Sequence, residues 1–181
     1  MQKSPVAIRK AVAVNFTFMQ IRAMIPSDWE EVARIYAEGM ATGYATFEQE
    51  VPSWESWDKN HLSTCRLVAS DKDKLLGWAA LSPVSSRCAY GGVGEVSVYV
   101  GSDARGRGIG KALMLRLITE SEAAGLWTLQ SGIFPENKAS IVLHENVGFR
   151  KIGVRKRVGK LHDQWKDNVL FERRSEIVGI D

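Results

Sequence analysis

Short runs in which hydrophobic and polar residues alternate recur along this chain, and stretches with helical spacing separate them. Alternation predicts strands, which we expect over residues 19–23, 66–70, 75–81, 93–100, 127–134, 149–158 and 165–173. Spacings of three and four predict helices, which we expect from residue 27 onward and over residues 53–62, 105–124 and 137–146. The order β-α-α-β-β-β-α-β-α-β-β, without a repeat, predicts an α/β fold with a single central mixed sheet flanked by helices.

Local signals support two of these elements. Ser27 stands three residues before Glu30, the capping-box spacing in which side chains satisfy free amides at a helix start. The polar turn at residues 71–74 separates two expected strands and predicts a hairpin.

The length of 181 residues and a hydrophobic content of 45% suit one domain that buries its own core. We expect this domain to cover residues 19–174, with an N-terminal extension over residues 1–18 and a C-terminal tail over residues 175–181. The first 27 residues contain no acid, but their few basic residues match a targeting segment only weakly. We therefore expect a cytoplasmic protein.

Composition excludes several classes of partner. The 24 Lys and Arg exceed the 21 Asp and Glu by three, a net charge too small to indicate nucleic-acid binding. Two cysteines and three histidines supply no four-ligand zinc pattern, so no metal site is expected. The longest apolar run, residues 11–19, is far shorter than the roughly 20 residues that span a membrane.

The clearest chemical signal is a glycine loop between a strand and a helix. The strand at residues 96–100 leads to Arg105-Gly106-Arg107-Gly108-Ile109-Gly110-Lys111, which opens an amphipathic stretch. Backbone amides in such a loop converge on one point, and the helix dipole adds positive charge there, so the loop suits a phosphate. The spacing fits neither the dinucleotide fingerprint, because position 111 is Lys, nor the P-loop, because Ala112 follows that Lys. A solvated surface turn is the alternative.

This loop resembles the pyrophosphate loop of the GNAT family of N-acetyltransferases, whose pattern Arg105, Gly108 and Gly110 meet. A second motif in the expected order, Asn137 to Phe149, resembles the family segment in which an Asn contacts pantetheine; a helix N-cap is the plainer role for Asn137. The resemblance implies the family's fold and acetyl-CoA as cofactor. It also implies as cofactor-binding residues Val98, Tyr99, Val100, Arg105, Gly106, Arg107, Gly108, Ile109, Gly110, Lys111, Asn137 and Ser140.

Further segments between residues 19 and 174 resemble one subgroup, the phosphinothricin and methionine sulfoximine acetyltransferases. They include residues 42–48, residues 87–90 and the Leu-His-Glu at residues 143–145. The resemblance implies acetylation of the α-amine of a small amino acid or analogue of the phosphinothricin, methionine sulfoximine or methionine sulfone type, by a homodimer. Ser85 and Ser86 depart from the larger segment that many relatives carry there, which leaves the side-chain preference open.

Candidate roles follow from chemistry. Glu95 lies on the expected strand, just before the backbone expected to hold the thioester, and is the candidate base for the acceptor amine. An exposed strand carboxylate or a structural ion pair is the alternative. His144 takes the place of a Tyr in most of the family and is the candidate acid for the departing thiolate; a packing histidine is the alternative. Arg87 is the candidate for binding a carboxylate, and a solvated loop arginine is the alternative. The expected acceptor-binding residues are Phe47, Ser85, Arg87, Tyr90, Glu95 and Ser97.

The leading hypothesis is therefore direct transfer in a ternary complex. No acyl-enzyme is expected, because Cys65 and Cys88 lack the sequence signature of an activated nucleophile. A peptide N-terminus is the alternative acceptor, and a non-catalytic acyl-CoA sensor is the alternative from another class. Nucleic-acid binding rests only on the basic residues between 150 and 160 and ranks last, since they alternate with apolar ones.

Overall fold

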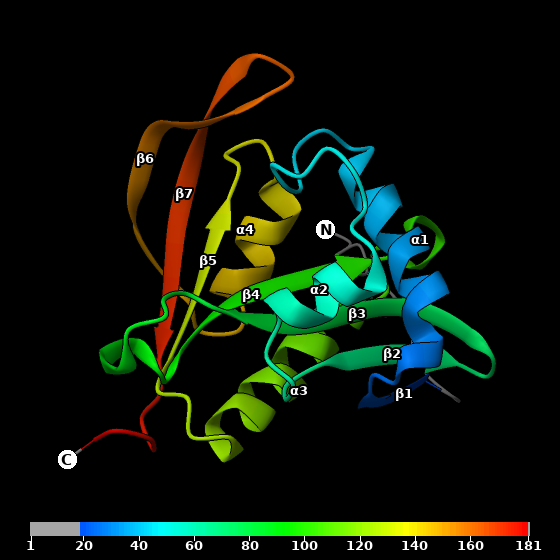
Figure 1. Cartoon of the computed structure of the whole chain (residues 1–181), viewed down its shortest axis with the longest axis horizontal. Coiled ribbons are helices and arrows are strands. Elements are labelled where there is room, and N and C mark those ends of the chain that lie inside the picture. The colour runs from blue at the N-terminus through cyan, green and yellow to red at the C-terminus, as the bar shows by residue number, and fades with distance from the viewer. Residues whose placement is uncertain (1–18, 181) are drawn as a thin grey trace, which may run out of the picture.

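The computed structural model describes residues 19–180, which form one seven-stranded sheet with helices on both faces (Figure 1). The expected extension at residues 1–18 lies outside the described residues. Every expected helix and strand is present, and the bounds differ from the expected ones by a few residues. In chain order the elements are β1 Met19–Ala23, α1 Trp29–Met40, α2 Trp54–Asn60, β2 Leu67–Asp71, β3 Lys74–Pro83, β4 Val93–Val100, α3 Ile109–Ala123, β5 Thr128–Ile133, α4 Lys138–Glu145, β6 Arg150–Leu161 and β7 Gln164–Arg174.

The strand order is β1-β2-β3-β4-β5-β7-β6, and all neighbours are antiparallel except β4 and β5. The prediction of a single mixed sheet is confirmed. The parallel pair joins only three residue pairs, from Val93 with Thr128 to Glu95 with Gln130. Beyond that point the two strands diverge, as Figure 1 shows, so the sheet is split along its middle.

Two apolar layers hold the sheet between helices. On one face α3 packs Ile109, Leu113 and Leu117 into a core with the inner strands. On the other face α1 and α2 bury Ile35 and Trp57. Because side chains alternate across a strand, β3 contributes to both layers and is buried along most of its length.

Two helix starts differ from the expected ones. The helix α1 begins at Trp29, and Ser27 lies within a short 3₁₀ turn, so the predicted Ser27–Glu30 capping box is wrong. Asp28 precedes α1 without a side-chain cap bond to it; its carboxylate accepts from the Ile25 amide at 2.9 Å, at the start of the 3₁₀ turn, and pairs with Arg22 at 2.7 Å. Helix α3 begins at Ile109 and not at Arg105, since the glycine loop before it is not helical.

Candidate active site

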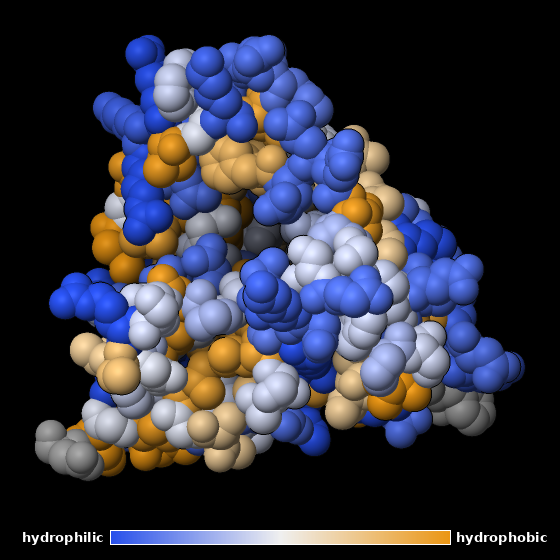
Figure 2. Space-filling view, viewed as in Figure 1, coloured by the Kyte–Doolittle hydropathy of each residue, from blue (hydrophilic) through white to orange (hydrophobic). Residues whose placement is uncertain are grey.

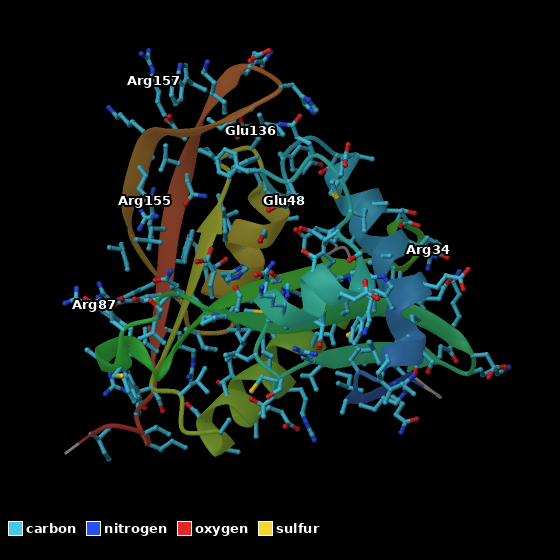
Figure 3. The ribbon with its side chains drawn as sticks, in the orientation of Figure 1. Arg34, Glu48, Arg87, Glu136, Arg155 and Arg157 are labelled. Carbon is cyan, nitrogen blue, oxygen red and sulfur yellow. The ribbon has the colours of Figure 1, made fainter. Side chains whose placement is uncertain are left out.

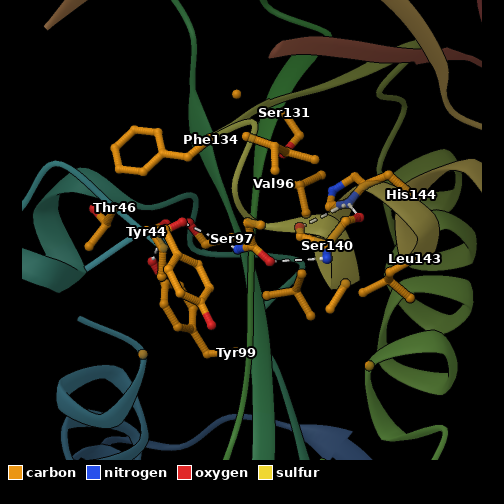
Figure 4. Close-up of a pocket in the computed structure, with 18 of the residues that line it drawn as sticks. Tyr44, Thr46, Val96, Ser97, Tyr99, Ser131, Phe134, Ser140, Leu143 and His144 are labelled. Atoms are coloured by element: carbon orange, nitrogen blue, oxygen red, sulfur yellow. Dashed lines mark hydrogen bonds between the residues drawn. The ribbon is translucent and has the colours of Figure 1, made fainter. Parts of the chain in front are cut away.

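A cleft of about 1110 Å³ opens where β4 and β5 diverge. Its walls come from the loop after α1, the split strands, the starts of α3 and α4, and the β6–β7 hairpin. Figure 2 shows the surface hollowed near the middle of this face. In the close-up of Figure 4, Tyr44, Thr46 and Tyr99 lie on one side of β4 and His144 and Leu143 on the other, with Ser97 on the strand between them.

The cleft exposes one edge of β4. Residues 96–100 pair with β3, but within residues 19–180 no strand pairs with their other edge. Tyr99 stacks on Trp78 toward the α1 face, while Val98 and Val100 pack toward α3. Backbone amides and carbonyls along such an edge need hydrogen-bond partners, and an extended ligand with amide groups can supply them.

The glycine loop stands at one end of this edge. Gly106 and Gly108 have positive φ angles of 73° and 79°, which only glycine adopts without strain, and they turn the chain into α3. A Cβ on Gly110 would lie 3.2 Å from the Leu143 side chain, so this glycine permits the close approach of α3 and α4. The free amides at the α3 start, with Arg105 and Lys111 on the cleft wall, form a site suited to an anion.

Asn137 performs the plainer role expected for it. Its side-chain oxygen accepts from the Ser140 amide at 3.1 Å and caps α4, while its Nδ2 lies 3.4 Å from the carbonyl of Tyr44. Both Asn137 and Ser140 also line the cleft. The cap and a ligand contact are therefore compatible at this position.

His144 is buried at the cleft wall, with 1% of its surface exposed. Its Nδ1 lies 2.8 Å from the carbonyl oxygen of Ser140. Because a carbonyl only accepts, Nδ1 carries the proton in the neutral ring and Nε2 is left with its lone pair. Burial lowers the pKa of His144, and within residues 19–180 its Nε2 has no hydrogen-bond partner.

Glu95 lies at the last residue pair before β4 and β5 diverge. Gln130 Nε2 donates a hydrogen bond to Glu95 Oε2 at 3.0 Å. Among the described side chains, no Lys, Arg or His nitrogen comes within 4 Å of this carboxylate, so the ion-pair alternative has no support in the structure. The carboxylate lines the cleft in a half-buried position.

The far end of the cleft is aromatic and is shaped by the β6–β7 hairpin. The Phe47 ring packs edge-on against Phe134 at 4.6 Å between centroids. It also covers Gly159, where a Cβ would come within 2.8 Å of the ring. Arg155 of β6 and Asn168 of β7 line this end as well. Sequence reasoning missed both, because no local pattern indicates which hairpin residues reach a cleft between other strands.

The structure brings most of the expected site residues to this cleft. Those that line it are Phe47, Glu95, Ser97, Val98, Tyr99, Val100, Arg105, Gly106, Gly108, Ile109, Gly110, Lys111, Asn137, Ser140 and His144. Arg107 is exposed and does not line it. Gln130 belongs to the site and was not expected from the sequence, where only its position opposite Glu95 after strand pairing would have indicated it.

Three expected acceptor-binding residues do not reach the cleft. Ser85, Arg87 and Tyr90 lie in the connection between β3 and β4, and none of them lines the cleft. This connection enters β4 at Val93, whereas the cleft opens beyond Glu95 at the other end of the strand. Figure 3 shows Arg87 apart from Glu48 and Arg155.

Neither cysteine lines the cleft. Cys65 is buried in the core and burial raises the pKa of its thiol, while Cys88 is exposed in the β3–β4 connection. Residues 19–180 hold no group of three or more His, Cys, Asp or Glu side chains arranged to bind a metal ion. No helix formed by these residues is long and apolar enough to cross a membrane.

Known proteins are similar to this chain in sequence and in fold. Residues 29–149 match the model of the Acetyltransferase (GNAT) family. The chain is 34% identical over 163 residues to phosphinothricin N-acetyltransferase of Alcaligenes faecalis, an alignment covering 84% of this chain and 81% of that protein.

Two solved structures are similar over most of their length. Ribosomal-protein-alanine N-acetyltransferase from Brucella melitensis matches with a TM-score of 0.81 and 30% identity, over 86% of this chain and 99% of that one. A phosphinothricin acetyltransferase from Sinorhizobium meliloti, in complex with acetyl-CoA, matches with a TM-score of 0.78 and 29% identity, over 90% and 96%. The expected fold is confirmed.

Proposed function

Because this chain belongs to the GNAT family of acetyltransferases, we propose that it transfers an acetyl group from acetyl-CoA to the α-amine of a small amino acid or analogue of the phosphinothricin type. The observation that carries the proposal is the cleft itself. Within residues 19–180, a strand edge without a partner strand, an anion site at a helix start and a carboxylate without a cationic partner open into the same space.

The cleft residues fit acetyl-CoA. The free edge at residues 96–100 suits the amide-bearing pantetheine arm, and the amides of the glycine loop suit the pyrophosphate. Arg105 and Lys111 add positive charge beside that loop. Acetyl-CoA supplies the activated acetyl group as a thioester. In this proposal the chain holds that group with Val98, Tyr99, Val100, Asn137, Ser140 and the loop at residues 105–111.

Glu95 is the proposed base. An amino-acid amine is mostly protonated at pH 7 and must lose a proton before it attacks a carbonyl carbon. Glu95 is ionisable, lines the cleft and has no cationic partner within residues 19–180, so its carboxylate is free to take that proton. Gln130 holds one of its oxygens and leaves the other for the acceptor.

His144 is the proposed acid for the departing sulfur. Its Nδ1–H is engaged by Ser140, so Nε2 is the nitrogen left to take up a proton; Nε2 is buried, and the ring packs against Phe149 and Phe171, so in this proposal it reaches the sulfur only by a local movement of the ring. Because burial lowers the pKa of His144, the neutral ring predominates at pH 7 and the protonated form is the minor, reactive one. An amide from the free edge of β4 near Val98 is the proposed donor to the developing oxyanion.

Direct attack in a ternary complex is the proposed route. Ping-pong transfer needs a nucleophile in the cleft, and both cysteines lie outside it. Initial rates with both substrates varied are expected to give intersecting and not parallel reciprocal plots.

Release of free CoA in the presence of acetyl-CoA and a set of acceptors tests the proposed activity. We expect turnover with phosphinothricin, methionine sulfoximine or methionine sulfone, and mass spectrometry should find the acetyl group on the α-amine. Absence of turnover with all three would contradict the amino-acid assignment. Acetyl-CoA binding without any turnover, unchanged by Glu95→Gln, would instead identify a sensor.

A peptide acceptor is the second candidate, because the similar structure from Brucella melitensis is named for a ribosomal-protein alanine. A peptide N-terminus requires an open exit from the acceptor site. In this chain the Phe47 ring lies against Phe134 and over Gly159 and takes up space at that end of the cleft, which favours a small acceptor. A peptide beginning with Ala, assayed beside the amino acids, distinguishes the two.

We also propose a homodimer that pairs through β6. This strand forms one edge of the sheet, and its apolar side chains Ile152 and Val154, which do not line the cleft, are each more than 40% exposed. An exposed apolar edge strand is a surface that proteins cover. Light scattering after gel filtration should give a dimer mass for the wild type and a monomer for Val154→Lys.

A further inference from the structure

The charged side chains on the cleft wall divide into two groups. Arg105 and Lys111 belong to the glycine loop, where the anion site lies. A further cation, Arg155, lines the cleft from β6, and two carboxylates, Glu48 and Glu95, line it as well. Among the described residues, none of these three side chains forms an ion pair.

Arg155 is too far from the glycine loop to share its anion. Arg155 pairs with Asn168 of β7, and β7 and β5 lie between β6 and β4 in the sheet. Three strand spacings of about 4.8 Å separate β6 from β4 by about 14 Å across the sheet. Glu95 is level with Gln130 and Glu172, and Asn168, opposite Arg155, lies four residues further along β7, or about 13 Å. The divergence of β4 and β5 widens this distance.

An unpaired arginine opposite an unpaired carboxylate is complementary to a zwitterion. A free amino acid carries an ammonium group, which suits Glu95, and a carboxylate, which matches the planar fork of a guanidinium. We therefore propose that Arg155 binds the α-carboxylate of the acceptor and selects free amino acids over neutral amines. This inference rests on the proposed function, and it replaces Arg87, which does not line the cleft, as the carboxylate-binding residue.

The dimensions agree with this assignment. The offsets across and along the sheet combine to about 19 Å between the Glu95 and Arg155 backbones, and extended Arg and Glu side chains of about 6 Å and about 4 Å leave roughly 9 Å between them. One hydrogen bond at each end takes about 3 Å, and the amine and carboxylate of one amino acid are about 3 Å apart. Figure 3 shows Arg155 beside the β6–β7 hairpin and Glu48 across from it, near the centre of the molecule.

Calorimetric titration of the CoA-loaded enzyme with methionine sulfoximine tests the proposal independently of turnover. Methionine sulfoximine has an uncharged side chain, so its α-carboxylate is its single anion. We expect Arg155→Ala to weaken binding about 10- to 100-fold, as loss of a charge-assisted bidentate contact does, and Arg155→Lys to weaken it less. The α-amide of methionine sulfoximine should bind the wild type and Arg155→Ala alike.

Arg157→Ala is the matched control. Arg157 is an exposed arginine of the same strand that does not line the cleft, and the interaction found for it, to Asp167, uses its backbone amide. This variant should bind methionine sulfoximine as the wild type does.

Equal binding of methionine sulfoximine by the wild type and Arg155→Ala, or no binding by the wild type, would overturn the assignment. A loss confined to Arg87→Ala, or an equal weakening of α-amide binding in Arg155→Ala, would also overturn it. An effect seen with phosphinothricin alone would place the side-chain anion on Arg155 and overturn it as well. The proposed function fails separately, on turnover, if the wild type binds these acceptors but acetylates none.

Discussion

Gln130 and Glu95 form the last pair between β4 and β5, and the amide of Gln130 donates to the carboxylate of Glu95 at 3.0 Å. This hydrogen bond joins the two strands at the point where they begin to diverge, so the neighbouring strand holds the proposed base where the cleft begins. A short parallel ladder thus fixes the position of one carboxylate, and strand pairing gives the site a rigid support.

The Gln130–Glu95 pair predicts graded losses of activity. Glu95→Gln removes the proton acceptor and should lower kcat about 10²- to 10⁴-fold, with little change in acetyl-CoA binding. Gln130→Ala keeps the carboxylate but frees its orientation, so kcat should fall less, about tenfold. Steady-state kinetics measure both.

The exposed carboxylate of Glu145, outside the cleft, offers the matched control Glu145→Gln, which should retain wild-type kcat. If Gln130→Ala were as slow as Glu95→Gln, the amide would have a larger role than orientation.

The glycine loop predicts separate effects on stability and on cofactor binding. Gly106 and Gly125 both have positive φ angles, 73° and 83°, and a Cβ on either meets open space. Alanine at either site should cost about 1 kcal/mol of stability, because the left-handed conformation is strained for it.

Only Gly106→Ala places a methyl group in the anion site, and its KM for acetyl-CoA should rise about tenfold, or ~1.4 kcal/mol. Urea unfolding and kinetics measure the two effects; an equal rise in Gly125→Ala would show that strain alone causes it.

We expect that substitutions of Asn137 can separate its role in capping α4 from its contact with the cofactor. Asn137→Ala loses the cap to Ser140 and should destabilise the protein by about 1 kcal/mol, whereas Asn137→Asp keeps an accepting oxygen and should not. Both variants lose the amide donor, so both should raise the KM for acetyl-CoA. Ser53 caps α2 in the same way, because its side chain accepts from the Ser56 amide. Ser53→Ala should therefore lower stability without changing the KM for acetyl-CoA. A normal KM in Asn137→Asp would restrict Asn137 to capping.

The burial of His144 leads us to expect that the protein loses stability in mild acid. Its pKa is lowered in the folded protein by burial, so the unfolded chain takes up a proton at a pH where the folded one does not. The contribution of neutral His144 to the free energy of unfolding is complete above about pH 6.5, the pKa of histidine in the unfolded chain. As the pH falls below that value, this contribution is lost at up to about 1.4 kcal/mol per pH unit. His61, whose pKa burial also lowers, adds to the slope.

Urea unfolding between pH 7.5 and 5.5 measures this dependence. His144→Gln should reduce the slope and leave the part due to His61. A slope that is identical in His144→Gln and the wild type would contradict a neutral, buried His144.

Much of the fold was predictable because it depends on local patterns. Alternation and helical spacing indicated each helix and strand, and the glycine loop indicated an anion site, since a left-handed turn before a helix needs glycine wherever it occurs. The starts of α1 and α3 were the exceptions. Ser27 lies in a 3₁₀ turn in which Asp28 pairs with Arg22, and the left-handed glycines at positions 106 and 108 delay the start of α3 to Ile109.

The acceptor site was less predictable. Ser85, Arg87 and Tyr90 are near Glu95 in sequence but enter β4 at the end away from the cleft. Arg155 and Asn168 are far from Glu95 in sequence, and the register of the β6–β7 hairpin brings both of them to the wall of the same cleft. That register shifts between Arg155 and Gly159, and a shift changes which side chains face the cleft.

The sequence by itself determined the elements, their order and the cofactor loop, because backbone preferences and hydrophobic periodicity act over a few residues. Only the tertiary structure decided which side chains meet across the cleft, because strand pairing and its divergence join residues that no local spacing relates.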